Sequence, residues 1–273
     1  MSDKMSTITS NTGTDASELV PRPSPTVTIH GKTIPVKCNE ASREHLDKAL
    51  SEPKFTKWVS EIGPTIVPSE LVIHHIKMFG PVNVGFITFE LNCTHRTAKD
   101  KKGNPMVLPG FVFLRGDSVA CLILIGEKET GRLLFLTVVQ TRVASGKECE
   151  EGPAGMCDRS VHKFTGPMMQ EIREETGIEV ELSEIIYLGD VEASPGGTAE
   201  ILKLHMVEKT MTSAEIAQLQ GKQITNGDEH IRVNIRPFTL KHVNATRDPK
   251  VMCAVAYLLE RQPRYFARMM AQE

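Results

Sequence analysis

The sequence predicts a mixed α/β fold in which helices pack on strands as a sandwich, preceded by a strand-rich segment. Two observations lead to this prediction. Runs rich in Val, Ile, Leu and Phe, separated by turn signals, fill residues 70–143. Beyond residue 165, helix-like and strand-like stretches alternate, as expected where helices cover a sheet. With 273 residues, 40% hydrophobic and 24% charged, the chain can form one large domain or two modest ones.

Residues 1–25 are polar and rich in Ser and Thr. They lack the apolar stretch of a secretory signal, and acidic residues interrupt what a transit peptide would keep basic. No run of about 18 apolar residues occurs, so we expect no transmembrane helix and no membrane partner. The formal net charge of -2 gives no reason to expect nucleic acid as a partner. We therefore expect a disordered tail on a cytoplasmic protein.

The segment after the tail is expected to begin with a hairpin and two helices, and to continue as strands. Residues 27–36 alternate around Gly31 as in a short hairpin. Residues 39–52 and 53–63 resemble short helices, the second with Pro53 in its first turn. Strands are then expected at 70–79, 82–92, 110–116, 118–127 and 132–143.

Histidines and cysteines give little indication of a metal site. His74 and His75 are neighbours in an expected strand, so their side chains should point to opposite faces. The six cysteines form no C-x-x-C pair, which fits reduced thiols in an intracellular protein. A site shared by Cys149, Cys157 and His162 is the open alternative to small buried residues, with loose spacing.

The second half of the chain mixes strands and helices. Strands are expected at 184–194, 199–210 and 230–238, and a helix at 212–220. Residues 248–270 are expected to be helical, with Asp248 as a candidate cap. The core-facing stripe of this last helix follows the i, i+3, i+4, i+7, i+8 pattern and consists of Val251, Ala254, Val255, Leu258 and Leu259.

The stretch GPMMQEIREETGIEV, residues 166–180, predicts an acidic helix. Thr165 can cap its start, Pro167 suits its first turn, and Gly177 can end it in a left-handed conformation. At about 100° per residue, the three carboxylates of Glu171, Glu174 and Glu175 share an arc of about 100°. Their mutual repulsion is poorly relieved by Arg173, which lies roughly opposite. The arc is therefore either a solvated face or a site for a hard divalent cation such as Mg²⁺.

The acidic helix is preceded by EGPAGMCD, residues 151–158, and followed by ASPGGTAE, residues 193–200. Together with the helix, these stretches resemble the Nudix hydrolase family, in its nucleotide-sugar branch and most closely the plant chloroplast ADP-sugar type. The family box reads G-x5-E-x7-R-E-U-x-E-E-x-G-U, with U an aliphatic residue, and the resemblance covers about residues 70–270. The second half of the box is matched in register by Glu171, Ile172, Glu174, Glu175, Gly177 and Ile178.

Three positions depart from the family box. Gln170 stands where the family has Arg, and His162 stands where it has an early Glu. The first glycine sits one residue early, at Gly155. In the family, the Arg orients the metal-binding carboxylates. Because Gln170 lies four residues before Glu174, its neutral amide could still reach that carboxylate, through a bond roughly half as strong as a charged one.

The resemblance implies a Nudix-type α/β/α sandwich with a mixed sheet at residues 111–273. It also implies an N-terminal strand-rich subdomain at 26–110, through which the chain would form a homodimer. Mg²⁺, for which Mn²⁺ could substitute, would be held by Glu171, Glu174, Glu175 and the backbone carbonyl of Ala154. Glu174 would thereby also be a catalytic residue.

The resemblance further implies the remaining site residues. The general base would come from the polar turn before residues 230–238, where Glu229 is our choice and Asp228 the alternative. Arg142 would contact a substrate phosphate, unless it is a surface residue in an ion pair. The loop Ser194, Pro195, Gly196 and Gly197 would let the backbone approach a ligand closely.

The activity that the resemblance implies is Mg²⁺-dependent hydrolysis of a nucleoside diphosphate sugar to a nucleoside monophosphate and a sugar phosphate. ADP-sugars, including ADP-ribose, are expected first and UDP-sugars next. The alternative is a degenerate domain that binds nucleotides or serves as a scaffold without turnover, because Gln170 and His162 depart from the box. No aromatic spacing marks a platform for the nucleobase.

Overall fold

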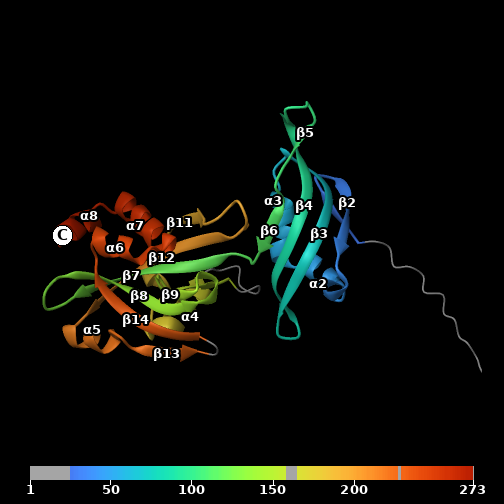
Figure 1. Ribbon diagram of the computed structural model, residues 1–273. Helices are drawn as coiled ribbons and strands as arrows, with labels where there is room; N and C mark the ends of the chain where they lie inside the picture. Colours follow the sequence, from blue (N-terminus) through green and yellow to red (C-terminus); the bar gives the residue numbers. More distant parts are fainter. Residues whose placement is uncertain (1–24, 158–164, 227–228, 273) are drawn as a thin grey trace, which may run out of the picture.

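The protein consists of two sheets, each with its own core, joined by a short connection (Figure 1). A computed structural model describes residues 25–157, 165–226 and 229–272. The mixed α/β prediction is confirmed, since helices cover the sheets and both sheets contain parallel and antiparallel neighbours. No helix in this described part of the chain is long and apolar enough to cross a membrane.

The N-terminal sheet has the order β1-β2-β3-β4-β5, with β6 beside β4. β6 follows the predicted boundary at residue 110, so this sheet extends to Leu114. Three short helices precede β3, and the second and third of them help to fill the core, where Trp58 packs edge-on against Phe89 at 4.6 Å between ring centroids. The strands are β1 (Thr26–Ile29), β2 (Lys32–Cys38), β3 (Ile66–Phe79), β4 (Asn83–Lys99), β5 (Pro105–Val107) and β6 (Phe111–Leu114), and the helices are α1 (Glu40–Arg43), α2 (Leu46–Ser51) and α3 (Pro53–Glu61).

The second sheet has the order β11-β12-β7-β8-β14-β13, and the short strands β10 and β9 pair with β7 and β8. β7 and β12 are parallel, and the other pairs are antiparallel. The strands are β7 (Ser118–Glu127), β8 (Leu133–Arg142), β9 (Lys147–Glu151), β10 (Ala154–Met156), β11 (Ile186–Glu192), β12 (Ile201–Met211), β13 (Gln223–Asn226) and β14 (Glu229–Pro237).

Helices cover both faces of this sheet, which gives an α/β/α sandwich. Alternate residues of β7 enter different cores: Leu122 packs toward one helical layer and Ile123 toward the other. The first layer is formed by α6 (Leu240–Thr246), α7 (Pro249–Arg261) and α8 (Arg264–Met270). The second is formed by α4 (Thr165–Thr176) and α5 (Ser213–Leu219), and short 3-10 turns occupy Val143–Ser145 and Leu182–Glu184.

Several elements differ from their predicted form. The helix predicted at 39–52 is divided into α1 and α2, and the one predicted at 248–270 ends at Arg261 because Pro263 cannot continue it. Sequence patterns did not predict α6 or the strands β5, β9, β10 and β13, which are too short to show periodicity. The two strand histidines, His74 and His75, are both exposed surface residues, and the register of β3 shifts between Ile73 and His75.

Candidate active site

A cleft of about 720 Å³ lies in the second domain, a volume in the range of small-molecule sites. One wall comes from α4, and the opposite wall comes from the turn between α6 and α7. Because these helices cover opposite faces of the sheet, the cleft reaches across it, over the ends of β8, β9 and β10. Strands β9 and β10 therefore form the middle of the site.

Helix α4 brings two of the three predicted carboxylates into the cleft. Met168 and Ile172 are fully buried and fix this helix on the sheet, so that Glu171 and Glu174 line the cleft. The helix ends at Gly177, as predicted: its φ is 75°, and its N–H donates to the carbonyl of Arg173 over 2.9 Å. The side chains of Thr165 and Pro167 lie outside the described residues.

The turn into β10 is packed directly on the first of these carboxylates. A Cβ at Gly155 would lie 1.8 Å from Oε1 and 2.0 Å from Cδ of Glu171. No side chain fits in that space, so the glycine allows the carboxylate to approach the backbone of β10. Gly155 lies one position earlier than the first glycine of the family box. It nonetheless lies beside Glu171, one of the carboxylates that would bind metal according to the box.

Glu175 has a different environment from its two neighbours. Its side chain is buried, and its Oε2 accepts a hydrogen bond from the backbone N–H of Ala154 over 3.1 Å. This bond ties α4 to the start of β10, where the Ala154 carbonyl was predicted as a metal ligand. Ala154 itself lines the cleft, so these two predicted ligands are brought together, with Glu175 at the back of the site.

The predicted contact of Gln170 is present. Its Nε2 donates to Oε1 of Glu174 over 2.7 Å, so a neutral amide holds the carboxylate that an arginine would hold in the family box. Within the described parts of the chain, no three His, Cys, Asp or Glu side chains converge as a ready-made metal site. Two cleft carboxylates and the Ala154 carbonyl are nonetheless hard oxygen donors, and Mg²⁺ commonly binds through one or two carboxylates plus water and substrate phosphates.

Arg142, expected either to contact substrate or to form a surface ion pair, forms a bidentate ion pair. Its Nε donates to Oε1 of Glu151 over 2.9 Å and its Nη2 to Oε2 over 3.1 Å. Lys250 of α7 reaches the same Oε2 over 3.1 Å. Burial raises the pKa of Glu151, but the bond from Arg142 and the charge of Lys250 outweigh it and leave the pKa below its ordinary value. This carboxylate therefore joins β8 and β9 to α7.

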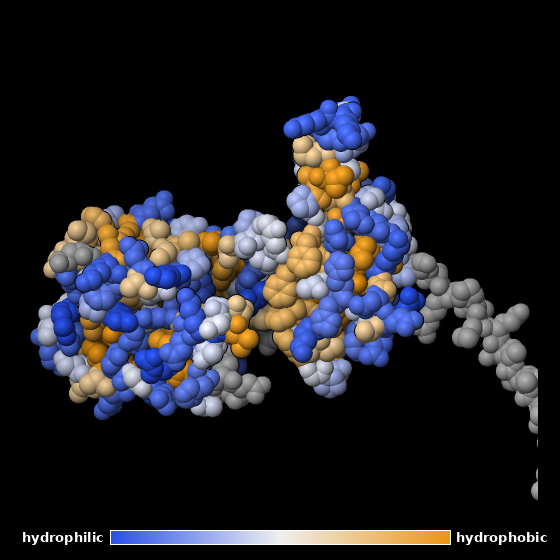
Figure 2. All heavy atoms as spheres, viewed as in Figure 1, coloured by the Kyte–Doolittle hydropathy of each residue, from blue (hydrophilic) through white to orange (hydrophobic). Residues whose placement is uncertain are grey.

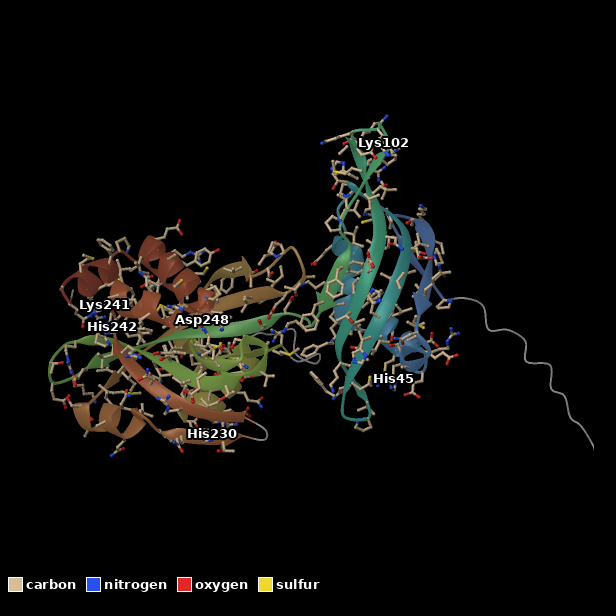
Figure 3. All side chains as sticks on the ribbon, viewed as in Figure 1. His45, Lys102, His230, Lys241, His242 and Asp248 are labelled. Carbon is tan, nitrogen blue, oxygen red and sulfur yellow. The ribbon has the colours of Figure 1, made fainter. Side chains whose placement is uncertain are left out.

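Asp248, the predicted cap of the last helix, also anchors the cleft. It is buried between the layer of α6–α8 and the strands (Figure 3). Its Oδ1 accepts the backbone N–H of Lys250 over 3.0 Å, as a cap does, and its Oδ2 accepts the N–H of Gly152 over 2.8 Å. The α6–α7 turn is thereby held against the turn that leads into β10.

The predicted substrate loop lies at the edge of the cleft. Ser194, Pro195 and Gly196 are exposed, and the flanking residues Ala193 and Glu200 are those that line the cleft. The carbonyl of Gly197 accepts the N–H of Phe113 over 2.8 Å, so β6 of the N-terminal domain supports this loop. Glu200 accepts the hydroxyl of Ser118 over 2.6 Å, with Arg115 3.6 Å away.

The predicted base and one box position lie outside the described residues. This applies to Asp228, to His162 and to the side chain of Glu229, of which only the backbone is described. That backbone begins β14, and Ile231 of β14 pairs with Gln140 of β8. The start of β14 therefore lies beside the end of β8, from which Arg142 reaches the cleft. A metal site of Cys149, Cys157 and His162 stays the open alternative for the same reason.

Sequence patterns did not predict several cleft residues, among them Glu151, Arg247 and Lys250. Glu151 and Lys250 are hydrogen-bonded to each other but lie 99 positions apart in the sequence. Glu151 opens the quoted stretch EGPAGMCD and directly follows Glu150, and this acidic pair before a turn was the available signal. Nothing in the sequence marks Arg247.

A comparison with curated proteins finds similarity to a plant hydrolase. The chain is 28% identical over 228 residues to Nudix hydrolase 14, chloroplastic, of Arabidopsis thaliana, and the match covers 78% of this chain and 71% of that protein. No family model matches the chain. The similarity supports the resemblance to Nudix hydrolases and, at that coarse level, a hydrolase.

Proposed function

We propose that this protein is a Nudix-type hydrolase that cleaves the diphosphate bond of nucleoside diphosphate sugars in the presence of Mg²⁺. ADP-sugars, including ADP-ribose, are the first expected substrates and UDP-sugars the next. The products would be a nucleoside monophosphate and a sugar phosphate. The observation that carries the proposal is the cleft itself, in which Glu171 and Glu174 lie beside the backbone of Ala154 and Gly155, with basic residues on the opposite wall.

The charges of the cleft suit a diphosphate. Glu171, Glu174 and the Ala154 carbonyl would hold Mg²⁺, with Glu175 behind them fixing the backbone of Ala154. When bound, Mg²⁺ neutralises phosphate oxygens and lowers the pKa of a coordinated water. Gln170 keeps the Glu174 carboxylate oriented toward the cleft. The Gly155 backbone leaves space for the Glu171 carboxylate.

The reaction also requires a proton acceptor for the attacking water. Attack of water oxygen on one phosphorus breaks the bond from that phosphorus to the bridging oxygen, which leaves on the other phosphate. We propose Glu229 as the base, with Asp228 as the alternative, because the start of β14 lies next to the cleft end of β8. The variant Glu229→Gln should then lower kcat far more than it raises KM.

A binding module without turnover is the second candidate. It is favoured by one observation, the neutral amide of Gln170 on Glu174 in place of a charged group. A neutral hydrogen bond is roughly half as strong as a charge-assisted one, so the carboxylate is held less firmly. Such a module would bind nucleotide sugars with or without Mg²⁺ and release no product.

Turnover of a small substrate panel tests the proposal. The panel contains ADP-ribose, ADP-glucose, UDP-glucose and GDP-mannose with Mg²⁺, and a phosphatase releases phosphate from the monophosphate products. We expect turnover of at least one ADP- or UDP-sugar, loss of turnover with EDTA, and loss in Glu174→Gln. An absence of turnover with both Mg²⁺ and Mn²⁺, combined with nucleotide-sugar binding, would favour the binding module.

We also propose that the protein forms a homodimer through its N-terminal domain. Large exposed apolar side chains are found on this domain, and Figure 2 shows apolar surface on it. They include Phe79, Val82, Met106, Val107 and Phe111, with Val107 exposed to 76%. A second copy packed against part of this apolar surface would remove that part from water. A monomeric mass by light scattering at micromolar concentration would contradict the proposal.

A further inference from the structure

Among the residues that the structure describes, four basic side chains line the cleft, and three of them have acidic partners. Arg142 is paired with Glu151, and Lys250 lies between Glu151 and Asp248 at 3.1 Å from each. Arg115 lies 3.6 Å from Glu200. The fourth is Arg247, which is exposed in the cleft and makes no side-chain hydrogen bond or ion pair with any residue that the structure describes. Its guanidinium thus has its full set of donors available.

The backbone at Arg247 does not favour an arginine. This residue ends α6 in the left-handed region, with φ 58° and ψ 18°, and its N–H donates to the carbonyl of Asn244. Glycine is the usual residue at such a position, because every other L-residue brings its Cβ too close to the backbone. From the arginine side chain the fold therefore gains neither a hydrogen bond or ion pair with a described residue nor a favourable backbone conformation.

The position of Arg247 relative to α4 is fixed by a chain of hydrogen bonds. The next residue, Asp248, is buried and accepts the N–H of Gly152. Ala154, two residues after Gly152, donates its backbone N–H to Glu175 of α4. The turn that carries Arg247 and the helix that carries Glu171 and Glu174 are thereby held as the two walls of one cleft.

We propose that Arg247 is the substrate-anion ligand of this cleft. Its guanidinium donates to non-bridging oxygens of the diphosphate, on the side away from the carboxylates of α4. The planar fork of an arginine matches two phosphate oxygens. This inference rests on the proposed function, because it takes the ligand to be a nucleoside diphosphate sugar. It also reassigns the role predicted for Arg142, whose Nε and Nη2 donate to Glu151.

The experiment compares three substitutions of Arg247 with a matched control. Arg247→Gln removes the charge and keeps the strained backbone, Arg247→Gly removes both, and Arg247→Lys keeps the charge without the fork. Lys241→Gln removes one positive charge on the same helix, at an exposed residue that does not line the cleft (Figure 3). The probe is α,β-methylene ADP-ribose, which cannot be cleaved at the diphosphate, and its affinity is measured by calorimetry with Mg²⁺.

We expect Arg247→Gln and Arg247→Gly to weaken binding of the probe about 10- to 100-fold, the range for a lost hydrogen bond to a charged group. Arg247→Lys should retain part of the affinity, and Lys241→Gln should bind as the wild type does. The Tm of Arg247→Gly should equal or exceed that of the wild type, because glycine relieves the left-handed strain. A loss of affinity at unchanged or raised Tm separates a ligand role from a structural one.

Turnover of nucleotide sugars and binding of the probe, measured separately, distinguish this inference from the proposed hydrolysis. If the wild type turns over no nucleotide sugar but binds the probe in a manner that depends on Arg247, the hydrolysis proposal fails and the inference stands. If the wild type turns over substrate while Arg247→Gln leaves KM and probe affinity unchanged, the inference is overturned and the hydrolysis stands. A wild type that neither turns over a nucleotide sugar nor binds the probe would overturn both.

Discussion

Replacing Gly155 with alanine should disable the site while leaving the fold intact. The new Cβ would lie 1.8 Å from Oε1 of Glu171, whereas carbon and oxygen atoms in contact are normally about 3.3 Å apart. The carboxylate must therefore retreat by roughly 1.5 Å, far beyond the roughly 0.2 Å tolerance of a metal ligand. A misplacement of about 1 Å can cost about 100-fold in rate, and we expect at least that loss in kcat.

The assay follows Mg²⁺-dependent turnover together with the Tm and Mn²⁺ binding. Gly155 does not have a left-handed φ, and the atoms that the Cβ meets belong to a flexible side chain, so the Tm should change little. Gly166→Ala is the matched control on α4, since a Cβ there meets nothing within 4 Å. Wild-type turnover and Mn²⁺ affinity in Gly155→Ala would refute the packing of Glu171 against β10.

Two further predictions concern the supports of the site. Gln170→Ala should lower kcat about tenfold, because it releases the Glu174 carboxylate. Gln170→Arg should raise kcat above the wild type if a charged hydrogen bond replaces the 2.7 Å hydrogen bond from the amide. Equal kcat values in the wild type and both variants would contradict this role of Gln170. Glu151→Gln should lower the free energy of unfolding by about 1–3 kcal/mol at pH 7, because Arg142 and Lys250 lose their shared acidic partner. The folded-state pKa of Glu151 is depressed, so its stabilisation is present above the ordinary value of 4.5 and is lost as the pH falls through the folded pKa. The Tm difference between wild type and Glu151→Gln should therefore shrink below pH 4.5, and a difference independent of pH would show that charge is not the cause.

Local sequence patterns predicted the features that depend on residues close together in the sequence. The spacing of Gln170 and Glu174 predicted their hydrogen bond, because residues four apart are neighbours on any helix. Gly177 predicted the end of α4, since its left-handed conformation is a property of that single position. The apolar runs predicted β7 and β8 because these strands are buried almost throughout.

These patterns could not predict contacts between segments that lie far apart in the sequence. The shared arc of Glu171, Glu174 and Glu175 suggested one cluster, but packing of α4 against β10 buries Glu175 and gives it the Ala154 N–H. The ion pair that was one of the two expectations for Arg142 is formed with Glu151, which the sequence could not identify because its strand, β9, is too short to recognise. Arg247 was missed because its place in the cleft depends on α6, another short element.

The measurement that tests the central claim most directly is the reaction of ADP-ribose in ¹⁸O-labelled water, followed by ³¹P NMR. The account predicts that, with Mg²⁺, the diphosphate signals give way to two monophosphate signals, one of them carrying the isotope shift of a single ¹⁸O. EDTA and the variant Glu171→Gln should both abolish the change. If ADP-ribose and the other panel sugars stay intact with Mg²⁺ and with Mn²⁺, while calorimetry shows that they bind, hydrolysis in this cleft is contradicted.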